Sequence, residues 1–365
     1  MEVPYEITIN ILSYLPVQSL LRFKCVSKSW CSLISCPNFQ LSNYRRERAM
    51  YTQWYYYQEN IRPSYGFINQ QLNVEKLNYP FLEKVEVSDY MHPMDICVLW
   101  GSCHGLILLN LYRHLFLYNP ATRSCTKFLR IDDYIWDGII RFGGLCYDSS
   151  KNDYKALMFT KEFVVIASLK GKKWRRAEFS YNIPSPCFDG YDGITFHGRL
   201  HFKMKVKKSY FDRRNSQNVY NFYDSGMSDC LICFDPIFEE FDTFPIPESK
   251  SDEEEIVISG LGVLNECLCM TCEYSKSFEI LVMKEYGVKE SWTPLFFIRN
   301  LLFFGFVVPL TVTENGELAL IIRNHNCQQV VIYNPKNDII REILVHGKTY
   351  LFITYVESLI LPKLE

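Results

Sequence analysis

Residues 3–39 read VPYEITINILSYLPVQSLLRFKCVSKSWCSLISCPNF, and the rest of the chain is organised around this stretch. Pro4 and Pro16 stand where helices can begin, because proline is tolerated in a first helical turn and stops a preceding helix. Apolar residues then recur three or four positions apart, which predicts three short amphipathic helices. Their apolar positions are Ile7, Ile11, Tyr14 and Leu15; Val17, Leu20 and Leu21; and Val26, Trp30, Leu33 and Ile34. A unit of about 40 residues rarely stabilises itself alone, so we expect another surface to cover much of this apolar area.

The whole stretch resembles an F-box of the plant type, most clearly in SLLRFKCVSKSW at residues 19–30. In that family the helices dock onto a Skp1-like adaptor, which connects them through cullin-1 to ubiquitin transfer. Where the family usually has leucine before the first proline, this chain has Val3. The alternative is a helical cap that packs only on the protein's own body. The adaptor contacts that the resemblance implies are Val3, Pro4, Pro16, Leu20, Leu21, Val26, Ser27, Lys28 and Trp30.

The composition limits the classes of partner. The chain has 365 residues, of which 48% are apolar, so it can build a large core and more than one domain. Its net charge of −2 and pI near 6.4 predict no electrostatic attraction to nucleic acid or to an anionic membrane. The chain has 14 cysteines, and Met1 is followed at once by Glu2, without the basic and apolar segments of a secretory signal. We therefore expect reduced thiols and a cytoplasmic or nuclear location.

The second half of the fold prediction is a large all-β domain. We assign residues 1–43 to the F-box and residues 44–94 to a connecting segment, with candidate first strands at residues 65–72 and 81–87. Residues 95–362 contain short apolar runs with a period of two, separated by turn residues, which indicates β-strands. The fold class is therefore α+β and multidomain, with a three-helix F-box followed by a propeller-like domain of degenerate kelch-like repeats.

Two turn signals alternate along the β domain. Asn-Pro or Asp-Pro follows an aromatic residue at residues 118–120, 234–236 and 333–335, which predicts a strand ending in an Asx-type turn. Trp174 and Trp292 each follow a glycine-containing hairpin signal, 54 and 56 residues after the preceding proline of this kind. A unit of about 50 residues matches a kelch-like blade, and residues 95–362 have room for about six. Paired glycines, which mark kelch repeats, occur only at Gly143 and Gly144, so we expect degenerate repeats and not a regular kelch array.

The β domain also resembles a known family. The segments GSCHGLILL (residues 101–109), YNPATR (118–123), MKEYGVKESW (283–292) and YVESLILP (355–362) are similar to the plant F-box-associated interaction domain. They are most similar to the branch of S-locus pollen F-box proteins, with the constitutive-immunity type close by. The resemblance implies a non-catalytic subunit of a Skp1–cullin–F-box ubiquitin ligase that captures a protein substrate; in the pollen branch, this is a pistil ribonuclease of self-incompatibility. The alternative is an adaptor-binding scaffold or an immunity-type regulator acting on another protein.

Several residues suggest a metal site or a catalytic site. Cys230 and Cys233, with Cys267, Cys269 and Cys272, could in principle bind zinc. Positions three apart in a strand point to opposite faces, however, so we expect buried reduced thiols. His197 and His201 flank a hairpin glycine and lack the helix and glutamate of a metalloprotease motif. We therefore predict no metal, no cofactor and no catalytic residues, and a propeller hydrolase is the least favoured alternative.

Two charged insertions interrupt the β domain. Residues 251–255 are acidic, and a basic group precedes them. Most such runs are solvated loops, but loops at a propeller rim can also select partners by charge. We hypothesise that the basic group contributes to substrate binding. Its members are Lys203, Lys205, Lys207, Lys208, Arg213 and Arg214.

Overall fold

The computed structural model begins with four short helices. They are α1 (Tyr5–Ser13), α2 (Val17–Phe23), α3 (Lys28–Ser35) and α4 (Pro37–Ser42), so three were predicted and α4 was missed. Pro4 and Pro16 are the N-caps of α1 and α2, and their carbonyls accept hydrogen bonds from Thr8 N (3.0 Å) and Leu20 N (3.0 Å). No helix in the described part of the chain is long and apolar enough to cross a membrane. The structure describes residues 4–42, 47–57, 60–68, 74–77, 97–111, 114–131, 142–160, 163–177, 179, 193–207, 227–247, 256–274, 277–299, 306–323, 328–343 and 348–361.

Six four-stranded antiparallel sheets follow within the described residues. The first three are sheet I, β24 (Lys348–Val356), β1 (Glu47–Tyr57), β2 (Asn60–Ile68) and β3 (Val74–Leu77); sheet II, β4 (Cys97–Cys103), β5 (Leu106–Leu111), β6 (His114–Asn119) and β7 (Ser124–Arg130); and sheet III, β8 (Phe142–Asp148), β9 (Asp153–Phe159), β10 (Val164–Ser168) and β11 (Lys173–Ala177). The others are sheet IV, β12 (Ile194–Phe196), β13 (Arg199–Lys207), β14 (Met227–Asp235) and β15 (Glu240–Phe244); sheet V, β16 (Val257–Leu264), β17 (Cys267–Tyr274), β18 (Ser277–Met283) and β19 (Trp292–Arg299); and sheet VI, β20 (Phe306–Val312), β21 (Leu318–Arg323), β22 (Gln328–Asn334) and β23 (Ile339–Ile343).

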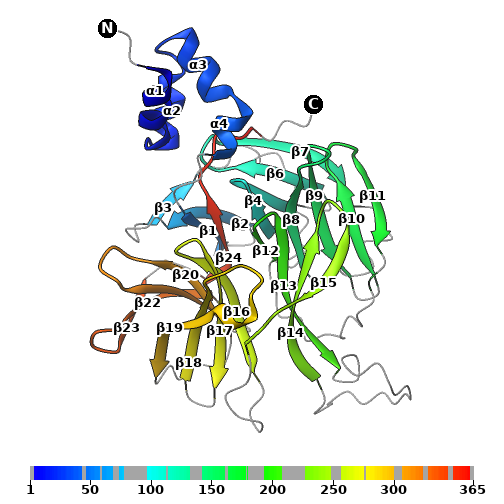
Figure 1. Cartoon of the computed structure of the whole chain (residues 1–365), viewed down its shortest axis with the longest axis vertical. Coiled ribbons are helices and arrows are strands. Elements are labelled where there is room, and N and C mark those ends of the chain that lie inside the picture. Colours follow the sequence, from blue (N-terminus) through cyan, green and yellow to red (C-terminus); the bar gives the residue numbers. More distant parts are fainter. Residues whose placement is uncertain are drawn as a thin grey trace.

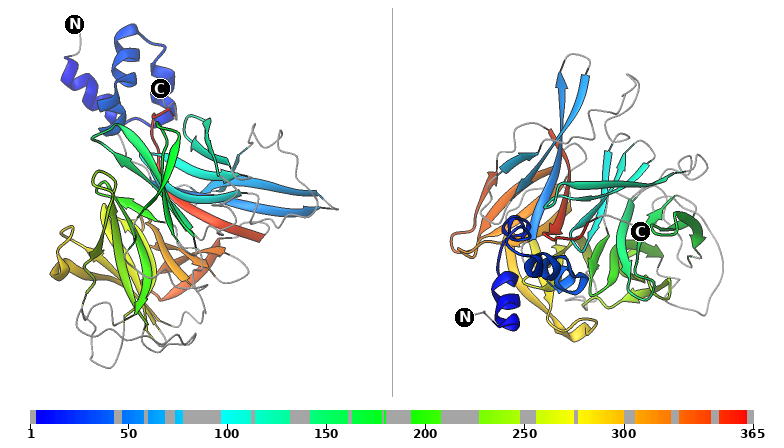
Figure 2. Two further views of the ribbon diagram at one scale, coloured as in Figure 1. Left: turned by 90° about the vertical axis from the view of Figure 1, so that its right-hand side faces the viewer. Right: turned by 90° about the horizontal axis from the view of Figure 1, so that it is seen from above.

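The sheets form a propeller. The first strand of each sheet contacts the first strand of the next from β24 through β4, β8, β12 and β16 to β20, and β22 contacts β24 to complete the ring. Figures 1 and 2 show the sheets arranged around a common centre, with the helices gathered at one side. The predicted propeller-like all-β domain behind a small helical unit is therefore confirmed.

Sheet I joins the two ends of the chain. Its β24 pairs antiparallel with β1, with Val356 opposite Glu47, and β1 pairs with β2. The segment predicted as a connection (residues 44–94) thus supplies three strands, of which β2 overlaps the candidate strand at 65–72. The candidate strand at 81–87 lies outside the described residues. The estimate of about six blades within 95–362 needs correction, because these residues hold five complete sheets and only one strand of sheet I.

Both turn signals lie at the turn between the third and fourth strands of a sheet. Asn119, Asp235 and Asn334 each end the third strand of a sheet, in sheets II, IV and VI. In each case the side-chain oxygen accepts a backbone N–H two residues on, at 2.8, 2.8 and 2.9 Å, as an Asx turn requires. Trp174 and Trp292 follow the corresponding turns of sheets III and V, in the fourth strand. The predicted Asx turns are therefore confirmed.

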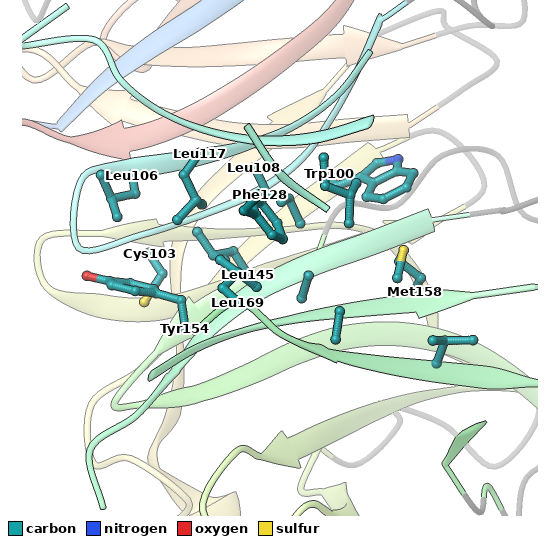
Figure 3. Packing of buried hydrophobic residues seen from close by; sticks show 14 of the residues in the cluster. Trp100, Cys103, Leu106, Leu108, Leu117, Phe128, Leu145, Tyr154, Met158 and Leu169 are labelled. Carbon is teal, nitrogen blue, oxygen red and sulfur yellow. The ribbon is translucent and has the colours of Figure 1, made fainter. Parts of the chain in front are cut away.

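Apolar side chains of alternate residues fill the space between adjacent sheets. Figure 3 shows one such cluster between sheets II and III, to which Leu106 and Leu108 of β5 contribute alongside Leu145 of β8. The pair Gly143-Gly144 lets β8 lie close to its neighbours. A Cβ at Gly143 would meet the Trp100 ring and the Leu157 carbonyl, and one at Gly144 would meet the Leu200 side chain. The paired glycines are therefore explained by close packing.

A buried cationic group links sheets III and IV. The Lys155 side chain on β9 is 2% exposed, and its Nζ lies 2.7 Å from Asp148 Oδ2 and 2.6 Å from Glu239 Oε1. Lys155 also donates a hydrogen bond to the Pro236 carbonyl at 2.5 Å. Burial raises the pKa of Asp148, but hydrogen bonds from Lys155 and Ser150 outweigh it and lower that pKa to about 2. The ammonium therefore holds the turn between β14 and β15 against sheet III.

We predict that Lys155→Ala lowers the free energy of unfolding by about 3–5 kcal/mol, because two carboxylates would lose their buried cation. Lys151→Ala is the matched control, since Lys151 lies 3.7 Å from the same Asp148 carboxylate but is 63% exposed. We expect it to cost under about 0.5 kcal/mol. Urea denaturation of both variants measures the difference, and equal losses would contradict the role given to burial.

Candidate functional site

The F-box helices present two apolar sets of side chains. The inner set is buried and packs with Leu359, which follows β24 at the other end of the chain. The outer set is 49–72% exposed, mainly along α1. Soluble proteins rarely expose several large apolar side chains on one small unit unless another molecule binds there. The outer set is therefore a candidate binding surface. The inner set is Leu12, Val17, Leu20, Leu33, Ile34 and Phe39, and the outer set is Tyr5, Ile7, Ile11, Tyr14 and Val26.

The residues predicted to bind an adaptor fall into different environments. Leu20 is only 2% exposed and belongs to the inner set, so its assignment as a surface contact is corrected. Val3 lies outside the described residues. Four outer residues, Tyr5, Ile7, Ile11 and Tyr14, were not among the predicted contacts, although the helical spacing of Ile7, Ile11 and Tyr14 had marked them as one face. Of the other predicted contacts, Pro4, Val26 and Lys28 are exposed, and Pro16, Leu21, Ser27 and Trp30 are half-buried.

Two of the half-buried residues have clear local roles. Ser27 is the N-cap of α3, and its Oγ accepts a hydrogen bond from Trp30 N at 3.1 Å. The Trp30 ring meets Phe23 of α2 edge to face, with ring centroids 5.4 Å apart. These contacts fix α3 against α2, so the same residues that the family resemblance assigns to the adaptor also set the shape of the unit.

We predict that Ser27→Ala destabilises the helical unit by about 1 kcal/mol, because the first turn of α3 loses its capping acceptor. Ser32→Ala, an exposed change within the same helix, is the control, and we expect it to be neutral or slightly stabilising because alanine favours helices. Thermal unfolding followed by circular dichroism compares the two. A loss in the control as large as in Ser27→Ala would contradict the capping role.

The strand connections define two edges of the propeller. In sheets II to VI, the turns between the first and second strands and between the third and fourth strands lie at one edge, because successive strands are antiparallel. We call this the F-box edge, since β1 begins there beside the end of β24 and the helices lie next to it (Figure 1). The connections between second and third strands leave from the opposite edge, which we call the far edge. Lys207 and Met227, the ends of β13 and β14, lie at the far edge.

The basic group is divided by the structure. Lys203 is 4% exposed on β13, and its Nζ lies 3.0 Å from Asp229 Oδ2 and donates to the Ile258 carbonyl. Ile258 N donates to the same Asp229 oxygen at 2.7 Å. Lys203 therefore links sheets IV and V internally, and its assignment as a substrate contact is corrected. Lys205 and Lys207 also lie in β13. Lys208, Arg213 and Arg214 lie outside the described residues.

The five cysteines considered as zinc ligands are divided among three apolar clusters, and Cys272 shares the cluster of Cys233. Cys230 lies in the cluster between sheets III and IV, whereas Cys233 lies in the one between sheets IV and V. Their strand faces are thus opposite, as expected for positions three apart, and burial raises the pKa of the Cys230 thiol to about 12. His201 is buried, and its Nε2 lies 2.8 Å from the Tyr286 hydroxyl. Burial lowers the pKa of His201 to about 4. Within the described ranges, no three His, Cys, Asp or Glu residues gather as metal ligands would.

Sequence comparisons agree with this two-part arrangement. A family model for the F-box domain matches residues 1–41, and one for the F-box associated beta propeller domain matches residues 68–358. F-box protein CPR1 of Arabidopsis thaliana is 26% identical, covering 88% of this chain and 80% of its own length. An F-box/kelch-repeat protein of the same plant is 28% identical, covering 95% and 94%. The crystal structure of TolB from Acinetobacter baumannii superposes with a TM-score of 0.49 at 9% identity over 84% of this chain and 66% of that one, a likeness too low to add to these matches.

Proposed function

We propose a function from one premise: the chain belongs to the F-box associated beta propeller domain family and carries an F-box domain before its propeller. The proposed function is that of substrate-recognition subunit in a Skp1–cullin–F-box ubiquitin ligase. The F-box would hold the ligase through a Skp1-like adaptor, and the propeller would hold a protein substrate. The chain itself would make no covalent bond. It would accelerate ubiquitin transfer by keeping substrate lysines near the charged ubiquitin carrier.

One observation carries this proposal, namely that the outer set of the F-box stays exposed while the inner set is covered. The propeller already covers part of the helical unit through Leu359 and Ala121. A cap that packed only on its own body would be expected to turn α1 inward as well. Instead, Ile11 and Tyr14 remain 53% and 72% exposed one helical turn apart. An apolar helix face of this kind suits a groove on a second protein.

We predict that the double change Ile11→Asp and Tyr14→Asp raises the dissociation constant for a plant Skp1-like adaptor by at least about 30-fold, because charges would enter the apolar interface. The melting temperature should change little, since both side chains are exposed. Gln18→Asp and Asn10→Asp, exposed polar positions of α2 and α1, form the matched control that adds the same charges. Calorimetric titration measures the affinity. Unchanged binding in the first variant would place the adaptor elsewhere on the chain.

The far edge of the propeller is the proposed substrate surface. The F-box occupies the other edge, so a substrate at the far edge would not compete with the adaptor for space. The basic insertion connects β13 to β14, whose joined ends lie at the far edge, and the acidic residues 251–255 precede β16, which begins at that edge. Oppositely charged insertions at one edge would favour partners of complementary charge and exclude others.

We predict that reversing Lys207, Lys208, Arg213 and Arg214 to Glu weakens substrate capture by about tenfold or more, because attraction becomes repulsion. Lys203 is left unchanged, since its removal would disturb the link between sheets IV and V. Exchanging Lys for Arg and Arg for Lys at the same four positions, which keeps the charge, is the control for loop alteration as such. The resemblance to the S-locus pollen branch makes a pistil ribonuclease the first substrate to test. Pull-down at two salt concentrations measures its capture, because binding by charge weakens as salt is added. Equal capture by wild type and the basic-loop variant would remove this part of the proposal.

The second candidate is an adaptor-binding scaffold or an immunity-type regulator that holds another target. The resemblance of the β-domain segments to the constitutive-immunity type of F-box protein is the reason for keeping it. A reconstituted ligase distinguishes the two, because a substrate subunit accelerates ubiquitin transfer to the captured protein and a scaffold does not. We also propose a cytoplasmic or nuclear location, supported by the buried free thiols of Cys103, Cys146, Cys230 and Cys233.

A further inference from the structure

The C-terminal segment, residues 357–361, lies between the F-box and the propeller. It follows β24 directly and runs to the helical unit, where Figure 1 shows the red end of the chain beside α4. Leu359 is 3% exposed within the inner set of the F-box. Ser358 is 1% exposed and Glu357 is 5% exposed, so three consecutive residues are buried. A segment without helix or strand that is buried in this way is held by specific contacts.

Asn119 supplies the polar part of these contacts. Its Nδ2 donates to the Ser358 carbonyl at 3.0 Å and to the Ile360 carbonyl at 2.6 Å, and its side chain is completely buried. Its Oδ1 meanwhile accepts from Ala121 N at 2.8 Å and Thr122 N at 3.2 Å. One amide thus closes the turn of sheet II with one end and binds the C-terminal segment with the other.

Two turns of sheet II make further contacts, one with the F-box and one with residues 357–361. Ala121, two residues along the same turn, packs against the inner set of the F-box. Gly105, in the first turn of sheet II, has a φ of +75° and lies so close to Ser358 and the Val356 carbonyl that an added Cβ would collide with both. Sheet II therefore contacts the C-terminal segment through two turns and the F-box through one of them.

We propose that residues 357–361 act as a clasp that fixes the orientation of the F-box on the propeller, with Asn119 and Leu359 as positioning residues. This inference rests on the proposed function for its purpose, because a ligase subunit must keep adaptor and substrate at a constant separation. Leu359 secures the F-box by apolar contact, and Asn119 secures the clasp to sheet II by two hydrogen bonds. Without them, the covalent connection at residues 43–46 and the β24–β1 pairing would remain.

Asn119→Asp isolates the clasp from the turn. Aspartate keeps an acceptor for Ala121 N and Thr122 N, as Asp235 does in the equivalent turn of sheet IV, but it cannot donate to the two carbonyls. Asn334→Asp is the matched control, because the Asn334 amide donates to Glu317 Oε1 (3.1 Å) in sheet VI. Leu359→Ala is a second variant, which removes the apolar contact without adding charge. Circular dichroism confirms that each full-length variant remains folded.

The test measures distances and ubiquitin transfer separately. Gln18 of the F-box and Lys336 of the propeller, both exposed, are each replaced by a non-canonical amino acid that carries a spin label. The distance between the two labels then reports the separation of F-box and propeller. We expect one narrow distance distribution in wild type and Asn334→Asp, and a broad one in Asn119→Asp and Leu359→Ala. Ubiquitin transfer should fall about tenfold in the latter two, with adaptor and substrate affinities unchanged.

A narrow distribution in both clasp variants would overturn the proposal. Broad distributions with unchanged ubiquitin transfer would overturn the positioning role while leaving the ligase function intact. If wild type transfers no ubiquitin, the proposed function fails, and the distances alone still decide whether the clasp exists.

Discussion

The antiparallel pairing of β24 with β1 is the constraint on which the other parts depend. It completes sheet I from the two ends of the described chain, with Val356 opposite Glu47, and so closes the ring of sheets. It also brings the start of the propeller and the end of β24 to the same edge. The F-box, which precedes β1, and residues 357–361, which follow β24, must therefore meet there. The contact of Leu359 with the F-box follows from that closure.

Much of the propeller could be predicted because its signals are local. Asn119, Asp235 and Asn334 specify their turns through bonds to the next few residues, and an Asx turn needs no distant partner. The pairing of β1 with β24 could not be predicted in the same way. The partner of β1 lies at the other end of the sequence, and a strand pattern carries no information about which distant strand will pair with it.

The functional surfaces were harder to predict than the fold for a related reason. Helical spacing marks Ile7, Ile11 and Tyr14 as one face of α1, but it does not say whether the protein itself or a partner covers that face. Leu20 has a similar local pattern and proved to be internal. Lys203 likewise reads as one member of a solvated basic run. Its burial depends on Asp229 and on the Ile258 backbone, which lie 26 and 55 residues further along the chain.

The closure of sheet I has a consequence for how the chain folds during synthesis. Glu47 emerges from the ribosome 309 residues before Val356, so β1 must wait with an unpaired edge while five complete sheets are made. Such an edge can pair with other chains, and contacts of this sequence separation form slowly. The ring can close only after Val356 has been made, which makes the nascent protein a natural client for chaperones that shield exposed strands.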